Sequence, residues 1–228
     1  YCADGNRRFA QIAIEAGFLY GAQLPKTVYY PPWFADQDFK RPRYVGYIQA
    51  IRHHRPYLAS VLDIEEWRRL DEYLMRAEEV SQYCTEVMLI PKVHGIIKEL
   101  PREINDKRVR LGYSVPTRFG GTTVPIGEFE EWPVHLLGGS PIKQFELAQK
   151  MNVVSTDGNY AQLMSKHCQY FVPDGSATYA RNRHWPTLKE ANGGTKWGDG
   201  SDKPDAPYEA FRRSCEAILA MWQPLKDT

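Results

Sequence analysis

The sequence predicts one α/β domain, a (β/α)8 barrel of the TIM type, spanning residues 1–228. Two observations predict this class. Short apolar runs alternate along the chain with amphipathic stretches, which is typical of parallel α/β proteins. In addition, eight of the apolar runs read as strands, and eight parallel strands suffice to close a barrel. The alternative is an open, doubly wound sheet, but no GxGxxG phosphate motif follows an early strand.

The first quarter of the chain predicts two helices and three strands. A helix at residues 9–16 precedes the first strand at 17–23. The segment at 27–35 is extended but interrupted by prolines, so it predicts only a weak second strand. A helix at 43–53 has apolar residues on one face, and the apolar run at 58–63 predicts the third strand.

The clearest helix lies at residues 65–83. Its apolar positions recur at helical spacing: Trp67, Leu70, Leu74, Ala77 and Val80. Glu65 and Glu66 suit the positive end of its dipole. A buried strand at 86–93 and a short helical segment at 94–103 follow.

The second half of the chain continues the alternation. Strands are expected at 109–115, 134–137, 153–155 and 169–172. Helices are expected at 141–151, 160–166 and 208–222, and Pro141 suits a first helical turn. A long polar loop, at about 174–206, precedes the last of these helices.

Composition excludes several classes of protein. The chain has 29 basic and 28 acidic residues, so any binding of nucleic acid requires a local basic patch. The four cysteines form no CxxC pair, which argues against a zinc ribbon and fits reduced thiols. No apolar run is long enough to span a membrane, and the first residues lack a signal-peptide core. We therefore expect a cytoplasmic protein with no metal and no cofactor.

Carboxylates follow three of the predicted strands. Asp36 and Asp38 end the second strand, Asp63 the third and Asp157 the seventh. Because catalytic groups of such barrels lie at the carboxyl ends of strands, we expect these side chains at one rim. Paired carboxylates suit glycosidic chemistry, in which one attacks or stabilises the anomeric carbon and another moves protons.

Each of these residues also has a purely structural interpretation. Asp63 would cap a helix that begins near Ile64. Asp157 would start an Asp–Gly turn. One of Asp36 and Asp38 is expected to be structural, and the sequence does not say which. The apolar runs directly upstream of Asp63 and Asp157 argue against solvated surface charges.

Two further groups of residues bear on function. Arg181, Arg183 and His184 lie among aromatic residues in the loop after the last strand, and Lys166 extends this basic group. Such a mixture suits a nucleic-acid backbone, although a solvated loop explains it equally well. His135, inside a strand, is interpreted as a satisfied core histidine. No GxSxG elbow, HExxH motif or P-loop is present.

The stretch VHLLGGSPIKQFELAQKMNVVSTDGN, residues 134–159, resembles the tRNA-guanine transglycosylase superfamily. In that family a strand ends in a Gly-rich turn before Ser/Thr-Pro, and a helix then leads to a strand that ends in the nucleophilic Asp. The sequence looks most similar to the DNA branch, the DpdA-like enzymes that put deazaguanine bases into DNA. The resemblance implies that Asp157 is the nucleophile and that Asp36, or else Asp38, is the second catalytic carboxylate.

The resemblance also implies a base-binding set: Asp63, Lys92, Gly112, Gly138 and Gly139. Lys92 stands where the family has a base-reading Gln, and Gly112 matches only loosely. The Cys-rich zinc site of the family is absent, so zinc is not implied. The Gly-Gly-Phe-Gln run that follows the second Asp in the family is absent as well.

The function implied is base exchange. Guanine in DNA, with tRNA as the less favoured alternative, would be replaced by a 7-deazaguanine base such as 7-cyano-7-deazaguanine, through a covalent Asp–sugar intermediate, in a bacterial or phage-infected cell. Two alternatives remain. One is a hydrolytic nucleobase glycosylase or nucleoside hydrolase that uses the same carboxylates. The other is a nucleic-acid-binding module without catalysis.

Overall fold

The computed structural model describes residues 6–38, 41–118, 120–173, 183–191 and 204–226. Its centre is one curled sheet with seven parallel strands, each hydrogen-bonded to the next in chain order. These strands are β1 (Gly21–Leu24), β2 (Phe34–Gln37), β3 (Leu58–Ile64), β4 (Glu86–Pro91), β6 (Lys107–Ser114), β7 (Val134–Leu137) and β8 (Val153–Thr156). A two-residue strand, β5 (Glu103–Ile104), pairs antiparallel with β6.

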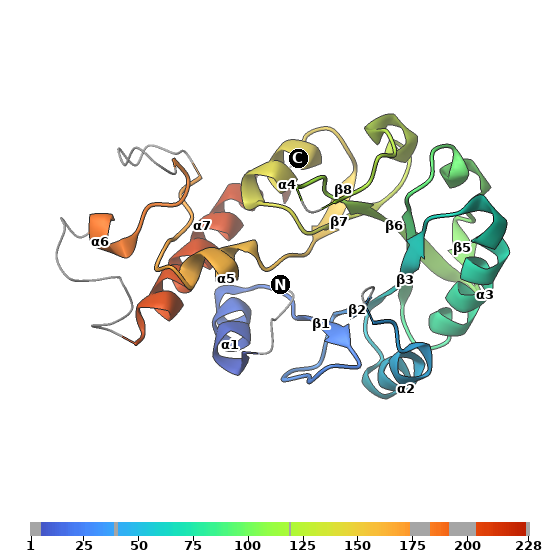
Figure 1. Cartoon of the computed structure of the whole chain (residues 1–228), viewed down its shortest axis with the longest axis horizontal. Helices are drawn as coiled ribbons and strands as arrows, with labels where there is room; N and C mark the ends of the chain where they lie inside the picture. The colour runs from blue at the N-terminus through green and yellow to red at the C-terminus, as the bar shows by residue number, and fades with distance from the viewer. Residues whose placement is uncertain (1–5, 39–40, 119, 174–182, 192–203, 227–228) are drawn as a thin grey trace.

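The predicted closed (β/α)8 barrel is wrong, because the sheet is a half-barrel. Within the described residues, β1 pairs only with β2 and β8 only with β7, so the sheet stays open between them (Figure 1). The segment expected to be the eighth strand, 169–172, lies outside this sheet. The backbone N–H groups of Tyr170 and Val172 donate to the carbonyls of Pro186 and His184. The N–H of Phe171 donates to Ser214 Oγ at 2.9 Å. Partners outside the sheet thus satisfy three backbone N–H groups of this segment, so it does not have to pair with β8.

The observed helices mostly lie at or near the positions predicted for them, although the predicted barrel is wrong. They are α1 (Arg7–Ala16), α2 (Tyr44–His54), α3 (Leu70–Ser81), α4 (Pro141–Ala148), α5 (Tyr160–Ser165), α6 (Leu188–Ala191) and α7 (Ala206–Lys226). Three 3₁₀ turns complete the set: η1 (Trp67–Arg69), η2 (Ile96–Glu99) and η3 (Ile126–Phe129). The α-helix expected from residue 65 thus begins later, after η1, and the helix expected at 94–103 is only the short turn η2. None of the described helices combines the length and apolarity that crossing a lipid bilayer requires.

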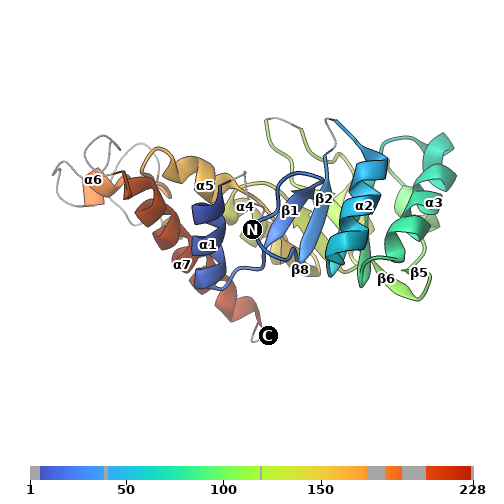
Figure 2. The same cartoon turned by 90° about the horizontal axis from the view of Figure 1, so that it is seen from below.

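The helices lie on two sides of the sheet. α2 and α3 lie on its convex face, where Tyr47, Ile51, Val87 and Leu89 are fully buried (Figure 1). Burial of each such side chain contributes about 1.5–3 kcal/mol to folding. α1, α5 and α7 pack together at the open side of the half-barrel, as both views show (Figures 1 and 2). The half-barrel is therefore flanked by a helical lobe where a closed barrel would have its remaining strand.

The concave face has an apolar layer of its own. Phe34, Leu58, Met88 and Ile90 are buried there as one cluster. Gly112 belongs to this layer, since an added Cβ would lie 2.9 Å from Ile90 Cγ1 and 3.0 Å from Leu137 Cδ1. A larger residue would collide with both side chains, so close packing accounts for this glycine. Polar groups share the concave face with this layer, and they form the site described next.

Candidate functional site

Four charged side chains gather at the carboxyl ends of the parallel strands. We call Asp36, Asp63, Lys92 and Asp157 the rim cluster. β2 carries Asp36, β3 carries Asp63, and Lys92 and Asp157 directly follow β4 and β8. The charges of Asp157 and Asp63 both act on Asp36, so the three carboxylates share one region. The structure therefore brings together the acidic residues that the sequence placed at one rim.

Asp36 has the most perturbed carboxyl group of the cluster. Burial is the largest cause and raises its pKa from 3.8 to about 7, and the negative charges of Asp157 and Asp63 add to the rise. Ser60 Oγ opposes the shift by donating a hydrogen bond of 3.0 Å to Asp36 Oδ1. At neutral pH the carboxyl group is thus close to half protonated. A group in that state can both give and accept a proton.

Asp157 is held by the Gly-rich turn that follows β7. The N–H of Gly138 donates to Asp157 Oδ1 at 2.9 Å. Gly138 has a φ of 67°, a left-handed conformation that favours glycine. Gln144 joins the two loops, because its Nε2 donates to the carbonyls of Gly138 at 2.7 Å and Asp157 at 2.6 Å. In the described part of the chain no hydrogen bond engages Asp157 Oδ2, so this oxygen is available to react.

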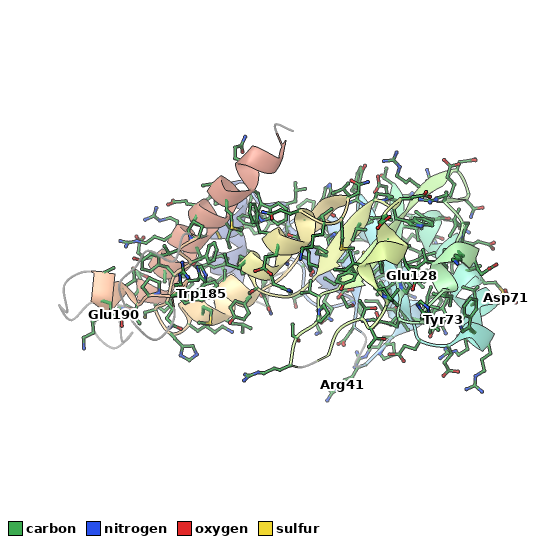
Figure 3. The ribbon with its side chains drawn as sticks, turned by 90° about the horizontal axis from the view of Figure 1, so that it is seen from above. Arg41, Asp71, Tyr73, Glu128, Trp185 and Glu190 are labelled. Carbon is green, nitrogen blue, oxygen red and sulfur yellow. The ribbon has the colours of Figure 1, made fainter. Side chains whose placement is uncertain are left out.

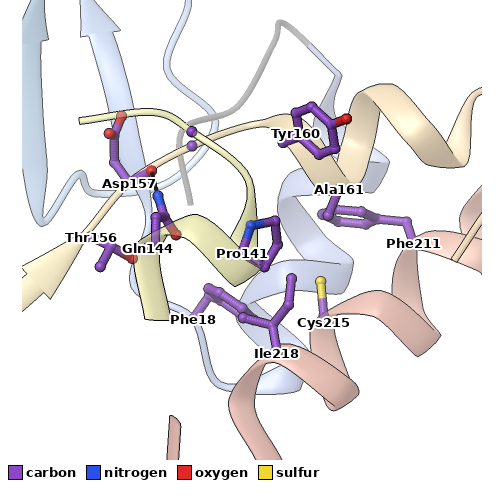
Figure 4. A pocket seen from close by; sticks show the side chains of 12 residues that line it. Phe18, Pro141, Gln144, Thr156, Asp157, Tyr160, Ala161, Phe211, Cys215 and Ile218 are labelled. Carbon is purple, nitrogen blue, oxygen red and sulfur yellow. Dashed lines mark hydrogen bonds between the residues drawn. The ribbon is translucent and has the colours of Figure 1, made fainter. Parts of the chain in front are cut away.

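A close view separates the polar and apolar sides of this turn. Gln144 lies next to Asp157, whereas Phe18, Cys215 and Ile218 gather farther along the same wall (Figure 4). The cavity among these residues has a volume of about 50 Å³, which leaves room for little more than water. The side chain of Asp157 points away from the apolar group (Figure 4). This small cavity therefore cannot hold a substrate of Asp157.

Below the rim cluster a buried polar network crosses the concave face. We call Glu86, Arg110, Ser155 and His135 the floor network. Arg110 forms an ion pair with Glu86, and both side chains are 7% exposed. Arg110 Nη1 donates to Ser155 Oγ at 2.6 Å, and Ser155 Oγ lies 2.6 Å from His135 Nδ1. His135 Nε2 lies 3.8 Å from Asp157 Oδ1, so the network leads to the rim cluster.

The surroundings of His135 favour one tautomer of its imidazole. Arginine can only donate, so Ser155 Oγ accepts from Arg110 and is free to donate its own proton to His135 Nδ1. Burial lowers the pKa of His135, although the adjacent Asp157 opposes the shift. The lowered pKa keeps the imidazole neutral at pH 7, and the tautomer with its proton on Nε2 is the favoured one, because Nε2 lies 3.8 Å from the carboxylate oxygen Oδ1 of Asp157. Nε2 has no hydrogen-bond partner in the described residues, so the interpretation of His135 as a satisfied core histidine is incomplete.

The other candidate carboxylates have clear partners. Lys92 Nζ lies 3.3 Å from Asp63 Oδ2, so these two predicted base-reading residues form an ion pair. Asp63 lies inside β3 rather than at a helix start, which rules out the interpretation as a helix cap. Asp38 lies 3.3 Å from Lys26 Nζ and accepts from the N–H of Arg41, so it organises its own loop. Of the pair left open by the sequence, Asp36 is the one in the rim cluster.

The predicted glycines have structural roles. Gly139 has a φ of 85°, and an added Cβ would lie 2.7 Å from Val115 Cγ1. Gly138 and Gly139 together therefore make the tight turn that orients Asp157. Gly112 packs against the apolar layer. Only Gly138 contacts the candidate nucleophile directly, through its N–H.

The described members of the predicted nucleic-acid-binding group belong to the helical lobe. Arg181 falls outside the described residues. Arg183 is exposed, and His184 Nδ1 lies 2.9 Å from the carbonyl of Val172. Trp185 and Glu190, from the same stretch, lie at the end of the molecule opposite Asp71 and Glu128 (Figure 3). Lys166, exposed just after α5, also belongs to the helical lobe. Arg183, His184 and Lys166, the described members of this group, are therefore not part of the rim cluster.

Sequence reasoning missed five residues that shape the site: Ser60, Glu86, Arg110, Gln144 and Ser155. A signal existed for two of them, because Glu86 and Arg110 are charged positions inside otherwise apolar strands. A fully buried charge requires a partner, so the two should have been paired. Across the described residues, no three His, Cys, Asp or Glu side chains gather as the ligands of a metal ion would.

A family model described as a "Family of unknown function (DUF6610)" matches residues 13–223. Comparisons with curated proteins and with solved structures gave no match.

Proposed function

We infer a function from the site and from the resemblance of residues 134–159, since the chain belongs to DUF6610, a family of unknown function. We propose that it is a pentosyltransferase that exchanges guanine in DNA, rather than in tRNA, for a 7-deazaguanine base such as 7-cyano-7-deazaguanine. Asp157 is the nucleophile and Asp36 the proton carrier. One observation supports this assignment above all. The pKa of Asp36 is about 7, in part because of the negative charge of Asp157, and Asp157 Oδ2 accepts no hydrogen bond from the described residues.

The two carboxylates can divide the chemistry of a double displacement. Asp157 Oδ2 forms a bond to the anomeric carbon while the bond from that carbon to guanine breaks. The electron pair goes to the departing base, and protonated Asp36 supplies the proton that neutralises it. In the second half, a nitrogen of the incoming base attacks the same carbon, Asp36 takes up the proton of that nitrogen, and Asp157 is released. Atoms and charges balance without a cofactor.

The polymer must present its nucleotide to a concave pocket. A stacked base hides the anomeric carbon, so the target nucleotide has to be flipped out or single-stranded. The rim cluster lies at the carboxyl ends of the parallel strands, where open as well as closed parallel α/β sheets bind their ligands. Asp63 and Lys92 form an ion pair in the same rim cluster and can hold polar edges of the flipped nucleotide.

Hydrolysis is a second candidate, and the openness of the half-barrel favours it. Because the sheet does not close between β1 and β8, water can reach Asp157 from the side. Water would then replace the incoming base as the acceptor. The two candidates differ in product, since hydrolysis leaves an abasic site and a free base.

The test is a base-exchange assay on the full chain. DNA and, separately, tRNA are incubated with labelled guanine or with 7-cyano-7-deazaguanine, and the nucleosides are analysed by mass spectrometry. Asp157→Asn, which keeps an oxygen for the N–H of Gly138, should lower exchange by roughly 10³-fold or more. Asp38→Asn is the matched control and should retain activity. Normal exchange by Asp157→Asn would refute the proposal, and abasic sites without exchange would favour hydrolysis.

A further inference from the structure

The open side of the half-barrel contains a cavity of about 480 Å³, which we call the seam cavity. It extends between β1 and β8 and reaches Asp157 and His135. Four aromatic side chains from three parts of the chain line it: Phe18 after α1, Trp33 and Phe34 at β2, and Trp222 on α7. Its volume is in the range of pockets that bind small molecules, about 300–1,000 Å³.

The charge of the lining restricts what can bind. Among the described residues that line the seam cavity, Asp157 is the only one with a charged side chain at neutral pH, and there is no lysine or arginine. A phosphate would meet a carboxylate with no cation to offset it, so an anionic nucleotide is disfavoured. The aromatic walls instead suit a flat, uncharged ring.

One polar group in the seam cavity lacks a partner. His135 is 1% exposed, and its Nε2 makes no hydrogen bond in the described part of the chain. The tautomer with its proton on this nitrogen is favoured, because Ser155 Oγ can donate to Nδ1 while Nε2 faces the carboxylate of Asp157 at 3.8 Å, so Nε2 acts as a donor. A buried donor without a partner costs about 1–3 kcal/mol. A ligand with an acceptor atom on its ring edge would remove this cost.

We propose that the seam cavity binds the free, uncharged heteroaromatic base, with His135 Nε2–H donating to a carbonyl oxygen or ring nitrogen of that base. The role of this base rests on the proposed function, in which one base leaves and another enters. The cavity opens sideways, through the gap between β1 and β8, whereas the polymer approaches the rim cluster at the strand ends. The base can therefore be exchanged while the sugar remains on Asp157.

The first experiment measures binding without any nucleic acid. The full chain is titrated by calorimetry with 7-cyano-7-deazaguanine, guanine and hypoxanthine, and with guanosine monophosphate as the anionic control. The neutral bases should bind, and the monophosphate should bind at least about tenfold more weakly. Absence of binding by every neutral base, or equal affinity for the monophosphate, would overturn the proposal.

A matched pair of variants locates the site. Val154, on β8, is 48% exposed and lines the seam cavity, so Val154→Trp should block it and lower base affinity at least tenfold. Met75, on α3, is 62% exposed and lies outside the cavity lining, so Met75→Trp should leave affinity unchanged. Equal affinities for the two variants would contradict the proposal.

His135→Leu tests the donor itself. It removes one hydrogen bond from an apolar-walled cavity and should weaken base binding about tenfold. Circular dichroism checks its fold, and the Val154→Trp and Met75→Trp pair decides the question if His135→Leu does not fold. Base binding without exchange in DNA would refute the proposed function and leave this site standing. Base exchange in DNA by a Val154→Trp variant that binds the free base as tightly as the wild-type protein would refute this site and leave the proposed function standing.

Discussion

The rim cluster and the floor network lie on the same concave face, but charge is balanced in the floor network and unbalanced in the rim cluster. Glu86 and Arg110 in the floor network are each 7% exposed and paired with each other. The rim cluster sets three carboxylates against one lysine, and its Asp63 and Lys92 are 29% and 15% exposed. This excess of negative charge, added to burial, raises the pKa of Asp36 to about 7. Strongly shifted pKa values of this kind are typical of catalytic groups. In the ion pair of Glu86 and Arg110, by contrast, neither buried charge lacks a partner.

One strand connects the two regions. β8 and the turn after it supply Ser155 to the floor network and Asp157 to the rim cluster, two positions apart and so on the same side of an extended chain. His135 bridges them, with Nδ1 at Ser155 and Nε2 toward Asp157. The paired floor network can thereby hold a reactive carboxylate in position while remaining stable itself. Disrupting each region separately tests this division of roles.

The largest loss of stability is expected in the floor network. Arg110→Met leaves Glu86 as a buried charge without its partner, which should cost about 3–5 kcal/mol of unfolding free energy. Urea denaturation measures it. The double variant Glu86→Leu/Arg110→Met should recover most of the loss, because both charges and the unpaired Nε of Arg110 disappear together. A double variant as unstable as the single one would show that the ion pair is not the cause.

In the rim cluster, Asp36→Asn should lower activity by about 10²–10⁴-fold, since the proton carrier is lost. The same change should raise stability at alkaline pH. A carboxyl pKa raised from 3.8 to about 7 means that the folded state retains a proton that the unfolded state releases. Stability is therefore lost as pH rises through this window, by at most roughly 1.4 kcal/mol per pKa unit.

Denaturation at pH 5 and pH 8 separates the variants. The wild-type protein should be less stable at pH 8 than at pH 5, and Asp36→Asn should reduce that difference. An identical pH dependence in both proteins would mean that Asp36 is not the perturbed group. The two regions then respond with opposite signs, because Arg110→Met lowers the free energy of unfolding whereas Asp36→Asn raises it at alkaline pH.

The sequence allowed six of the seven parallel strands and the place of Asp36, Asp63 and Asp157 to be predicted, because both follow from local patterns. The exception is β2, which was expected at 27–35 and lies at Phe34–Gln37. A strand is marked by an apolar run, and its carboxyl end by the polar residues that follow. Closure of the barrel is not local. Residues 169–172 have the pattern of a strand, but their hydrogen bonds go to residues 184 and 186, close in sequence and outside the sheet.

The floor network shows the same limit at the level of side chains. Ser155, His135 and Arg110 come from three strands, and their contacts depend on which face each residue occupies in the curled sheet. The bulge in the pairing of β7 with β8, between Val134 and His135, shifts that register. A histidine within a strand can then be recognised as buried, but the partner of each ring nitrogen cannot be read from its neighbours in sequence.

A smaller effect is expected where the two regions meet. Ser155→Ala removes the acceptor of Arg110 and the donor to His135 Nδ1, which should cost about 1–3 kcal/mol of stability. It also frees the imidazole to place its proton on either nitrogen. Nitrogen NMR of the wild-type protein should show an unprotonated Nδ1 and a protonated Nε2 at His135, and the variant should show a mixture. A wild-type Nδ1 that carries the proton would contradict the tautomer derived from the floor network.

The smallest effect is expected at Asp38, which separates position in the sequence from position in the site. Asp38 lies two residues after Asp36, but its partner Lys26 is 60% exposed, and a surface pair of this kind contributes about 0–1 kcal/mol. Asp38→Asn should therefore change stability by less than about 1 kcal/mol and leave base exchange intact, measured beside Asp36→Asn. If instead Asp38→Asn lost activity as Asp36→Asn does, the loop would have to close over the rim cluster during the reaction, and the proton carrier would be Asp38.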